Sequence, residues 1–563
     1  MGHARADDLK LAFEKGTEAL PKKNMLQISM DGPNVNWSFY KKVEQSLADE
    51  YGLNLLNLGS CGLHIVNGAF QKGLSSTGWR IDGFLRAIYQ LLHDCPARRE
   101  EYLKVTETQD GLLPLSFCPT RWVENTPVLE RALQILPNLA TYVSAVGGKR
   151  TPNPDTKSFD EVCQSLKNPL LEAQINFALS VSKSVTPFLT KYQTDKPMVP
   201  FLAADLHKML KNLMCRFIKP EVMQEAKSVK KLLDVDIKLP TNYIDCSSVD
   251  LGYVTNRILK ELRAKQKVGA STIMDFRRSC RDGLVAMVDK LQQKSPLKYI
   301  LVKNMGFLDP VNMANEETDQ LKGMLRRTLA YLVDQGRINE QDCDEIIQQY
   351  AHFLDDVVQK NHSAFADFNS LSDRVDTLLY TCMSKEKELQ KLWKMCRQLL
   401  LLSHGQGTVE RGFSVNRKIE VENLVEDTYR AQRMIVDHLR IVGGIENVAV
   451  DKELLLSVSC ARQRYIASLE EKKKKEETQA KNQKRKALFE EIEELQSKKK
   501  RLESDMKALV ESADKYALKA ESTGQVTLIA KSNSLRHGAK EKKVELEKLE
   551  KQLSEKQLHF KSK

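Results

Sequence analysis

Leucines that recur every seven residues restrict the C-terminal part of this chain to helices with one apolar stripe. The first series consists of Leu488, Leu495, Leu502 and Leu509, with Ile492 and Met506 at intermediate positions. The second series consists of Leu546, Leu549, Leu553 and Phe560. Gly524 and Gly538 lie between the two series, where charge density is low, so the pattern predicts two helices joined by a break.

The sequence leaves the partner of each stripe open. The two helices could fold back on each other, could pair with another chain, or could form a charged helix without a partner. Parallel self-pairing would stack the basic residues near Lys498 in register, whereas the Glu-rich segment 541–552 is a better electrostatic neighbour. We therefore expect an antiparallel hairpin within the chain.

Basic residues gather in the same C-terminal region. The chain has a formal net charge of +12, and residues 466–563 hold 25 Lys and Arg against 18 Asp and Glu. The three basic clusters are Lys472, Lys473, Lys474 and Lys475; Lys484, Arg485 and Lys486; and Lys498, Lys499, Lys500 and Arg501. Such clusters are typical of nuclear import signals and nucleic-acid contacts, and equally typical of a solvated helix face.

Composition excludes several classes of protein. No stretch approaches the roughly 18 to 20 apolar residues that span a bilayer, and the first residues lack an apolar signal region. Eleven cysteines without a CxxC pair argue against a disulfide framework and against a zinc finger. With 41% hydrophobic and 29% charged residues, we expect an intracellular, helix-rich protein of about two to four domains without a membrane partner.

The stretch "LQISMDGPNVNW", residues 26–37, ends an alternating apolar run on Asp31. The alternation has the period of a buried strand, and "DGPN" is a turn signal. A helix that ends at Gly52 and a second apolar run, "LNLLNLGS", follow, which predicts a parallel βαβ unit. Asp31 then lies at a strand end, where binding groups gather, or only caps the helix that follows.

Three further short motifs carry candidate functional residues. "CGLH" places Cys61 and His64 three residues apart on one helix face, as metal ligands or as packing residues. "PTRW" presents Arg121 beside Trp122, which could bind phosphate or stack on a base, or could cover a half-buried ring. In "GTVERGF", the break before Glu410 predicts a new helix whose first turn favours this carboxylate.

The order of these motifs resembles the hAT superfamily of DNA transposases and their host-adopted descendants. The resemblance covers residues 26–439 and rests on "SMDGPNVNW", "CGLH", "PTRW", a long helical stretch and "ERGFSVN". It implies an RNase H-like fold in which three carboxylates hold two divalent metal ions, with a helical domain inserted before the third carboxylate. Such a metal pair would support cleavage and joining of DNA strands.

The resemblance assigns roles to individual residues by motif. Asp31 matches the second carboxylate, and Glu410 matches the third. Cys61 and His64 match a structural CxxH element of the family. Arg121 and Trp122 match an element near the DNA ends.

The sequence departs from the family at both ends. The family's first carboxylate lies on a strand well upstream of the second, but only 30 residues precede Asp31, and Asp7 and Asp8 lie in a segment that reads as helical. The first three strands and the N-terminal zinc finger are missing, whereas the coiled-coil tail is an addition. We therefore expect no retained metal site, with Mg²⁺ or Mn²⁺ as a cofactor only if the protein is an active enzyme.

The expected fold is mostly α with a small α/β part: a partial RNase H-like core interrupted by a large helical insertion and followed by a C-terminal coiled coil. We expect four segments: a partial RNase H-like α/β segment at 1–77, the helical insertion at 78–400, RNase H-like helices with a dimerisation region at 401–465, and the basic coiled-coil tail at 466–563.

The expected function is that of a transposase-derived nuclear protein. The missing first carboxylate favours a protein without catalytic activity, although the enzyme question stays open. We expect a homodimer with DNA as a candidate partner and without a small-molecule substrate. The two alternatives are an active hAT-type transposase that lacks its N-terminal part in this sequence, and a cytoplasmic coiled-coil scaffold.

Overall fold

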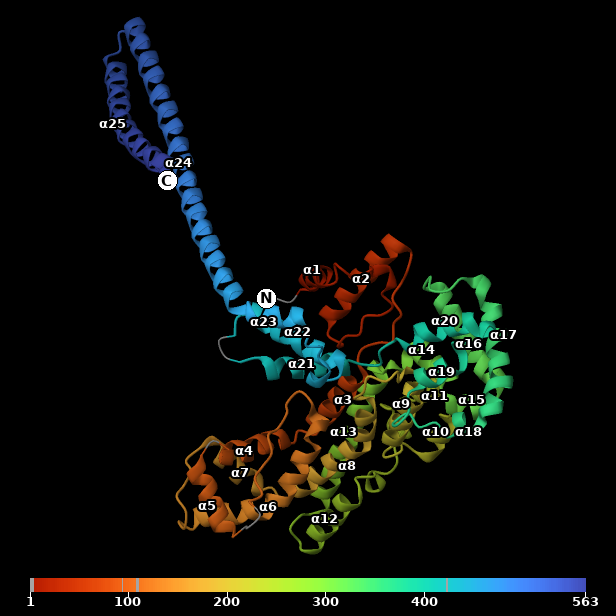
Figure 1. Cartoon of the computed structure of the whole chain (residues 1–563). Helices are drawn as coiled ribbons and strands as arrows, with labels where there is room; N and C mark the ends of the chain where they lie inside the picture. Colours follow the sequence, from red (N-terminus) through yellow and green to blue (C-terminus); the bar gives the residue numbers. More distant parts are fainter. Residues whose placement is uncertain (1–4, 94, 108–110, 422–423, 563) are drawn as a thin grey trace. The chain divides into compact units, whose positions relative to one another are not determined.

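The computed structural model describes residues 5–93, 95–107, 111–421 and 424–562 and divides the chain into two compact units, Met1–Glu422 and Asn423–Lys563 (Figure 1). Helices account for most of the described residues in both units, which confirms the mostly α fold class. None of the described helices combines the length and the apolar character needed to span a bilayer. All eleven cysteines are free thiols.

The helices of the first unit follow one another with short connections. Its first helices are α1 (Ala6–Gly16), α2 (Asn34–Tyr51), α3 (Gly62–Ser76), α4 (Ile81–His93), α5 (Pro96–Thr106), α6 (Thr126–Gly147), α7 (Lys157–Leu166), α8 (Leu171–Tyr192), α9 (Val199–Met214), α10 (Pro220–Glu225) and α11 (Val229–Asp234). They are followed by α12 (Tyr253–Ala264), α13 (Ala270–Lys294), α14 (Ile300–Asn304), α15 (Pro310–Asn315), α16 (Thr318–Asp334), α17 (Cys343–His352), α18 (His362–Ala366), α19 (Val375–Met383), α20 (Gln390–Leu400) and α21 (Gly407–Ile419). A short 3₁₀ helix, η2 (Trp122–Asn125), directly precedes α6.

The predicted strands are wrong, because the described residues contain no β-strand. Segments 26–30 and 53–58 are nevertheless extended, and the Leu56 N–H donates to the Leu26 carbonyl at 2.8 Å. Isolated bonds of this kind fall short of the repeated pairing that makes a parallel sheet.

Side chains form hydrogen bonds with backbone groups of the two extended segments, where a neighbouring strand would bind in a sheet. The Arg337 guanidinium donates to the Met25 carbonyl at 2.8 Å and to the Asn54 carbonyl at 2.8 Å. The Tyr331 hydroxyl accepts the Asn57 N–H at 3.2 Å. Arg337 is 283 residues from Asn54 in the chain. No local sequence pattern therefore reveals that side chains, and not a second strand, bind these backbone groups.

A small core joins the two extended segments to α2. Its buried members are Met30, Tyr40, Leu47 and Leu55. Gly52 follows the last turn of α2 with a φ of +65°, which residues with a Cβ rarely adopt. The predicted helix end at Gly52 is confirmed, and the chain turns there into its second extended segment.

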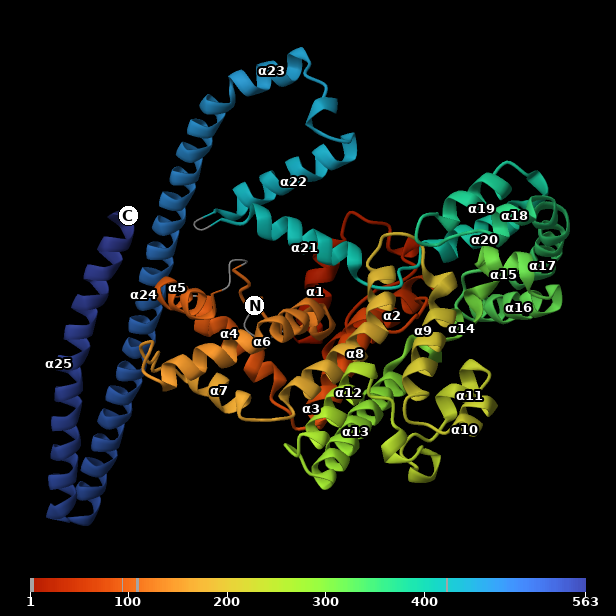
Figure 2. The ribbon, with the colours of Figure 1, turned by 90° about the horizontal axis from the view of Figure 1, so that it is seen from below.

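One continuous core joins the helices from α3 to α20. Within it, α3 packs along α13, as both views of the ribbon show (Figure 2). Gly73 and Gly283 meet at this crossing, where a Cβ on Gly73 would lie 2.8 Å from the Gly283 carbonyl oxygen. The close approach therefore requires glycine and fixes α3, whose first turn carries candidate site residues.

The second unit has four α-helices among the described residues, two of them long. They are α22 (Glu426–Val442), α23 (Lys452–Ser459), α24 (Ala461–Thr523) and α25 (Val526–Ser562). Lys499 of α24 pairs with Glu550 at 2.6 Å, and Lys542 of α25 pairs with Asp505 at 2.7 Å, so the two long helices run antiparallel. The buried seam between them consists of Leu488, Ile492 and Leu553, with Leu495 and Phe560 packed against it. The expected hairpin within the chain is confirmed.

The turn of the hairpin is shorter than the predicted break. Gly524 ends α24 with a φ of +67°, and α25 already begins at Val526. Small residues in the following helix allow α25 to approach α24 closely: Ser532 Oγ donates to the Ala513 carbonyl at 2.8 Å. A segment of low charge density that reads as a break is thus helix, because small side chains pack well against a neighbouring helix.

Candidate functional site

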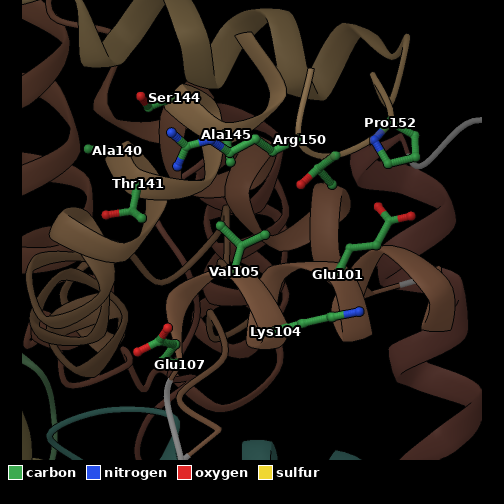
Figure 3. Close-up of a pocket in the computed structure, with 11 residues that line it drawn as sticks. Glu101, Lys104, Val105, Glu107, Ala140, Thr141, Ser144, Ala145, Arg150 and Pro152 are labelled. Atoms are coloured by element: carbon green, nitrogen blue, oxygen red, sulfur yellow. The ribbon is translucent and has the colours of Figure 1, made fainter. Parts of the chain in front are cut away.

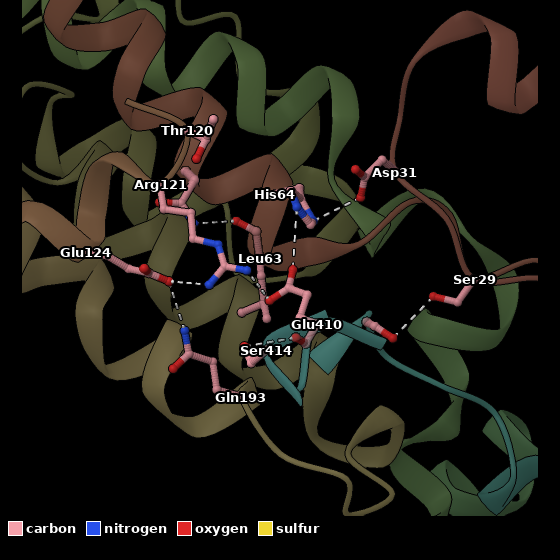
Figure 4. A network of polar contacts seen from close by, with 12 residues as sticks. Ser29, Asp31, Leu63, His64, Thr120, Arg121, Glu124, Gln193, Glu410 and Ser414 are labelled. Atoms are coloured by element: carbon pink, nitrogen blue, oxygen red, sulfur yellow. Dashed lines mark hydrogen bonds and ion pairs between the residues drawn. The ribbon is translucent and has the colours of Figure 1, made fainter. Parts of the chain in front are cut away.

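Residues from distant parts of the first unit meet in one polar cluster (Figure 4). Asp31 lies in the loop before α2, while Cys61 caps α3 and His64 lies in its first turn. Arg121 directly precedes η2, and Glu410 lies in the first turn of α21, as the sequence predicts. We call these five residues the Asp31–Glu410 cluster.

Two cationic side chains hold the carboxylates of the cluster. Arg121 Nη2 donates to Glu410 Oε2 at 2.6 Å. His64 Nε2 lies 3.6 Å from Glu410 Oε1, and His64 Nδ1 lies 3.1 Å from Asp31 Oδ1. The Asp31 contact has the distance of an ion pair without the alignment of a hydrogen bond. The imidazole therefore lies between the two carboxylates.

Cys61 is the buried member of the cluster. Its side chain is only 2% exposed, and its N–H donates to the Met30 carbonyl at 3.2 Å. A Cβ on Gly405 would lie 3.2 Å from Cys61 Sγ, so the segment before α21 packs directly on the thiol. This shielding makes Cys61 a poor candidate for a nucleophile, since a substrate could not reach the sulfur atom.

Cys61 and His64 shift each other's pKa. Burial raises the pKa of the Cys61 thiol, but the hydrogen bond and charge of His64 outweigh burial and lower it. The hydrogen bond to Cys61 raises the pKa of His64, burial opposes this, and the charges of Asp31 and Glu410 raise the pKa further. The net effect favours protonated His64, which neutralises the carboxylates on both sides of the ring.

Two asparagines fix the loop that presents Arg121. Asn67 of α3 accepts the Val123 N–H at 3.0 Å through Oδ1. Asn125 accepts the Cys118 N–H at 2.7 Å and donates to the Cys118 carbonyl at 2.8 Å, which closes the loop on itself. The sequence interpretation missed both residues. Asn67 gives a weak signal as a polar residue in an apolar helix, whereas Asn125 gives none.

Trp122 belongs to the core and not to the polar cluster. Its side chain is 8% exposed, and its ring lies 5.0 Å from that of Phe117 and 6.5 Å from that of Phe70. Neighbours in sequence thus have different surroundings: Arg121 reaches Glu410, while Trp122 anchors the loop beneath it. The ring is not available to stack on a base.

Residues that flank Asp31 and Glu410 bind each other, although they are far apart in sequence. Gln27 donates to the Ser403 carbonyl at 2.9 Å and accepts the Ser403 N–H at 2.7 Å. Ser29 Oγ donates to the Gly405 carbonyl at 3.2 Å. These contacts, which we call the 27–405 clasp, hold the segment before α21 against the segment before α2.

Gln406 links the two carboxylate-bearing segments directly. With its amide oriented to match its neighbours, its NH₂ group donates to Asp31 Oδ1 at 2.6 Å and its oxygen accepts the Asp31 N–H at 3.1 Å. The Gln406 carbonyl accepts the Glu410 N–H at 2.9 Å in the first turn of α21. The sequence interpretation missed Gln406, because only the fold brings it beside Asp31.

The cluster does not fit the metal pair that the family resemblance implies. Arg121 is bound to one oxygen of Glu410, and His64 separates Asp31 from Glu410. In the part of the chain that the structure describes, no group of three or more His, Cys, Asp or Glu is arranged to hold a metal ion. The arrangement is a set of compensated charges and offers no free carboxylate pair for a cation.

Asp7 and Asp8 do not supply a further carboxylate to the cluster. Both lie on α1, as the sequence predicts. Asp7 pairs with Lys42 at 2.6 Å, and Asp8 accepts the Arg5 N–H at 3.3 Å. These carboxylates stabilise the start of α1 and its contact with α2.

The basic clusters lie on α24 in the second unit, in two different settings. Residues 472–475 and 484–486 are fully exposed and lie before the first seam residue, Leu488. The third cluster lies within the hairpin, where Lys499 pairs with Glu503 at 3.7 Å and with Glu550 at 2.6 Å. Arg485 of the second cluster lies 5.1 Å from the centre of the Phe560 ring of α25. The first cluster lies furthest from the seam.

An open cavity of about 790 Å³ lies between α5, the end of α6 and the loop that follows (Figure 3). Lys104 and Arg150 face Glu101 and Glu107 around it, so its charges largely balance. None of the residues that the sequence interpretation selected lines this cavity. It does not bear on the function that the motifs predict.

Comparison of the chain with protein-family models, curated proteins and solved structures gives no match. The functional argument therefore rests on the motifs and on the contacts described above.

Proposed function

We propose that this chain is a hAT-type, transposase-derived nuclear protein that forms homodimers, contacts DNA and does not cut it. One observation carries the proposal: residues of four separate motifs, spaced over almost 380 residues, meet in the Asp31–Glu410 cluster. Convergence of this kind is what common ancestry of a site predicts. Unrelated short matches would have no reason to lie together.

The order of the elements gives further support. Asp31 follows an extended segment that lies beside a second one, and a continuous helical core separates Arg121 from Glu410. An RNase H-like core with a helical insertion before its third carboxylate would have this order. In our proposal, segments 26–30 and 53–58 are the remnant of its sheet, and the α24–α25 hairpin is an added coiled coil.

The absence of cleavage follows from the charge pairing in the cluster. Metal-dependent phosphoryl transfer depends on carboxylates that position divalent cations. Here Arg121 and His64 occupy the oxygens of Glu410 that a metal ion would need. We propose that the cluster now stabilises the fold by joining α3, α21 and the Arg121 loop.

The experiment that tests this proposal supplies the purified chain with duplex DNA and Mg²⁺ or Mn²⁺. We expect binding of DNA without strand cleavage or joining. Cleavage that disappears in Asp31→Ala and in Glu410→Ala would identify the active transposase alternative instead. Absence of any DNA binding in the same assay would contradict the proposed DNA contact.

Self-association is proposed through helices α22 and α23, which have no buried residue. Large apolar side chains on or next to them are exposed by 58 to 83%: Met434, Ile435, Ile441, Ile445, Val450, Leu455, Leu456 and Val458. Exposed apolar residues in such density mark a protein interface. The family resemblance implies that the same surface of a second copy of this chain binds here.

Sedimentation tests the homodimer. The triple variant Met434→Ser, Ile435→Ser, Ile441→Ser is expected to convert a dimer into a monomer. Leu558→Ser, which changes an equally exposed residue of α25, should leave the dimer intact. A native chain that sediments as a monomer at micromolar concentration would contradict self-association.

Nuclear location is proposed from the exposed basic clusters. Replacing residues 472–475 and 484–486 with Gln is expected to shift a fluorescent fusion of the chain from nucleus to cytoplasm. An unchanged distribution would remove the import role of these clusters, and a cytoplasmic native fusion would favour the scaffold alternative.

A further inference from the structure

The first 27 residues of α24, 461–487, lie before the buried seam of the hairpin. Every one of these residues is exposed, and the buried seam begins only at Leu488. Near the end of α25, Lys556 donates to Glu491 at 2.5 Å, and the Phe560 ring lies 6.0 Å from that of Phe489 and 5.1 Å from the Arg485 guanidinium of α24. We call 461–487 the single-helix segment.

Half of the net charge of the chain lies in the single-helix segment. It holds ten Lys and Arg against four Glu, a surplus of six out of +12. The paired part, 488–562, holds sixteen against fourteen. The hairpin is therefore nearly neutral, and the positive charge is concentrated where no partner helix compensates it.

Beyond Leu469, the last of three exposed apolar residues that also include Tyr465 and Ile466, the segment has no apolar stripe with which to enter a membrane or a hydrophobic groove. Between residues 470 and 486, Ala480 is the only apolar residue. A helix that lies on a bilayer needs a large apolar face, and helix-in-groove recognition by proteins needs apolar anchors at helical spacing. The partner must therefore bind through charge and hydrogen bonds.

Amide side chains gather on one face of this helix. At 3.6 residues per turn, Gln479, Asn482 and Gln483 share one face, and Glu470 and Glu477 lie on the opposite one. Three lysines, Lys472, Lys475 and Lys486, lie on the same face as the amides, and Glu471 and Glu476 lie at its two edges. A face on which amides alternate with lysines suits a groove with anionic walls.

We infer that the single-helix segment binds double-stranded DNA in the major groove, with its amide face towards the base edges. The major groove is about 12 Å wide and admits one α-helix of about 10 to 12 Å diameter. Lys472, Lys475 and Lys486 beside the amides then reach the phosphates, and Glu470 and Glu477 point away from the DNA. Duplex RNA is excluded as the partner, because its major groove is too deep and narrow.

The inference rests on the DNA contact proposed above and assigns that contact to a helix outside the region of family resemblance. Residues 472–486 would cover about 22 Å of groove. Amide side chains pair with adenine edges, whereas lysines bind phosphates without regard to sequence. Binding should therefore be strongly salt-dependent, with a modest base preference.

Fluorescence anisotropy with the full chain and a labelled DNA duplex tests the charge requirement. Replacing all four residues of 472–475 with Gln should weaken binding at least tenfold at 100 mM salt. The slope of log affinity against log salt should fall by about 3 to 4, since each phosphate contact contributes about 0.9. Gln preserves helix propensity, and circular dichroism verifies that the helix is retained.

The matched control removes the same number of charges from the hairpin, by changing all four residues of 498–501 to Gln. We expect less than a threefold change in affinity. Equal loss in both variants would overturn the inference in favour of a net-charge effect and leave the proposed DNA contact standing. No DNA binding by the native chain would overturn both. Equal affinity for duplex RNA or for phosphatidylserine vesicles would also overturn the inference.

A second pair of variants tests the orientation of the helix. Asn482→Glu places a negative charge on the amide face and should weaken binding about tenfold. Glu477→Gln removes one negative charge from the opposite face, a change of equal size and opposite sign, and should change affinity less than threefold. Effects of equal size would overturn the placement of the amide face against the bases.

Discussion

Charged side chains serve opposite purposes in the two units of the chain. In the Asp31–Glu410 cluster, a few charges from distant segments compensate one another, half-buried against a large core. In the single-helix segment, many charges from one local stretch stay exposed and unbalanced. In the first region the charges are satisfied by one another. In the second they face the solvent, where a partner of opposite charge can reach them.

The largest expected effect concerns the core under the cluster. Trp122→Ala should lower the free energy of unfolding of the first unit by about 3 to 5 kcal/mol, because it empties a packed aromatic site. Chemical denaturation followed by circular dichroism measures this change. Trp122→Phe, which keeps most of the packing, should cost clearly less. A loss below about 1 kcal/mol for Trp122→Ala would show that the Arg121 loop does not depend on this ring.

Removal of a buried side chain should lower the free energy of unfolding less in the hairpin than in the core of the first unit. Leu488→Ala is expected to cost about 2 kcal/mol, at the lower end for such substitutions, since a two-helix seam encloses the side chain on fewer sides. Thermal unfolding followed at 222 nm should show an earlier helix loss from the tail alone. Leu558→Ala, at a residue that is 74% exposed, is the control and should shift the transition little. An earlier transition of the whole chain would contradict independent units.

Removal of the arginine tests whether the cluster is internally satisfied. Arg121→Ala should lower stability by about 1 to 2 kcal/mol, because Glu410 then loses its closest cation. Arg278→Ala breaks an exposed ion pair with Asp275 at 2.9 Å and should cost less than about 0.5 kcal/mol. Urea titration of both variants measures the difference. Equal costs would mean that the cluster behaves as an ordinary surface pair.

The smallest expected effect is a pH dependence that only the cluster should show. The pKa of His64 is raised by its hydrogen bond to Cys61 against the effect of burial, with a further contribution from Asp31 and Glu410. Its stabilisation is therefore complete below the ordinary value of 6.5 and is lost as pH rises through the raised pKa. The stability difference between the native chain and His64→Gln should shrink over that range. A difference that grows with pH would contradict protonated His64 as the stabilising form.

Local signals in the sequence predicted what depends on local structure. The end of α2 at Gly52, the position of His64 in the first turn of α3 and the position of Glu410 in the first turn of α21 are confirmed for this reason. The heptad leucines likewise predicted the seam of the hairpin. The helix end and the two first turns are decided by residues within about two helical turns, and the heptad spacing decides which face of each long helix is apolar.

Contacts between distant segments could not be predicted in the same way. The strand expectation was wrong, because Arg337 takes over carbonyls that a neighbouring strand would bind. Gln406 and Asn67 escaped notice, since their partners are contributed by other elements. The sequence could not show that Arg121 belongs to the polar cluster and Trp122 to the core. Adjacent side chains point to different surroundings only once the loop has folded.

The 27–405 clasp has a consequence for the order of folding. It closes a loop of 376 residues, and Asp31 and Glu410 come together only when this loop is closed. Contacts of such high sequence separation form late, because the entropy of loop closure must be overcome before they contribute. During synthesis, Asp31 leaves the ribosome long before Glu410 exists. The cluster therefore assembles after the helical region has folded. Slow protection of the Ser403 and Asp31 amides from hydrogen exchange, whose acceptors are Gln27 and Gln406, would report completion of the first unit.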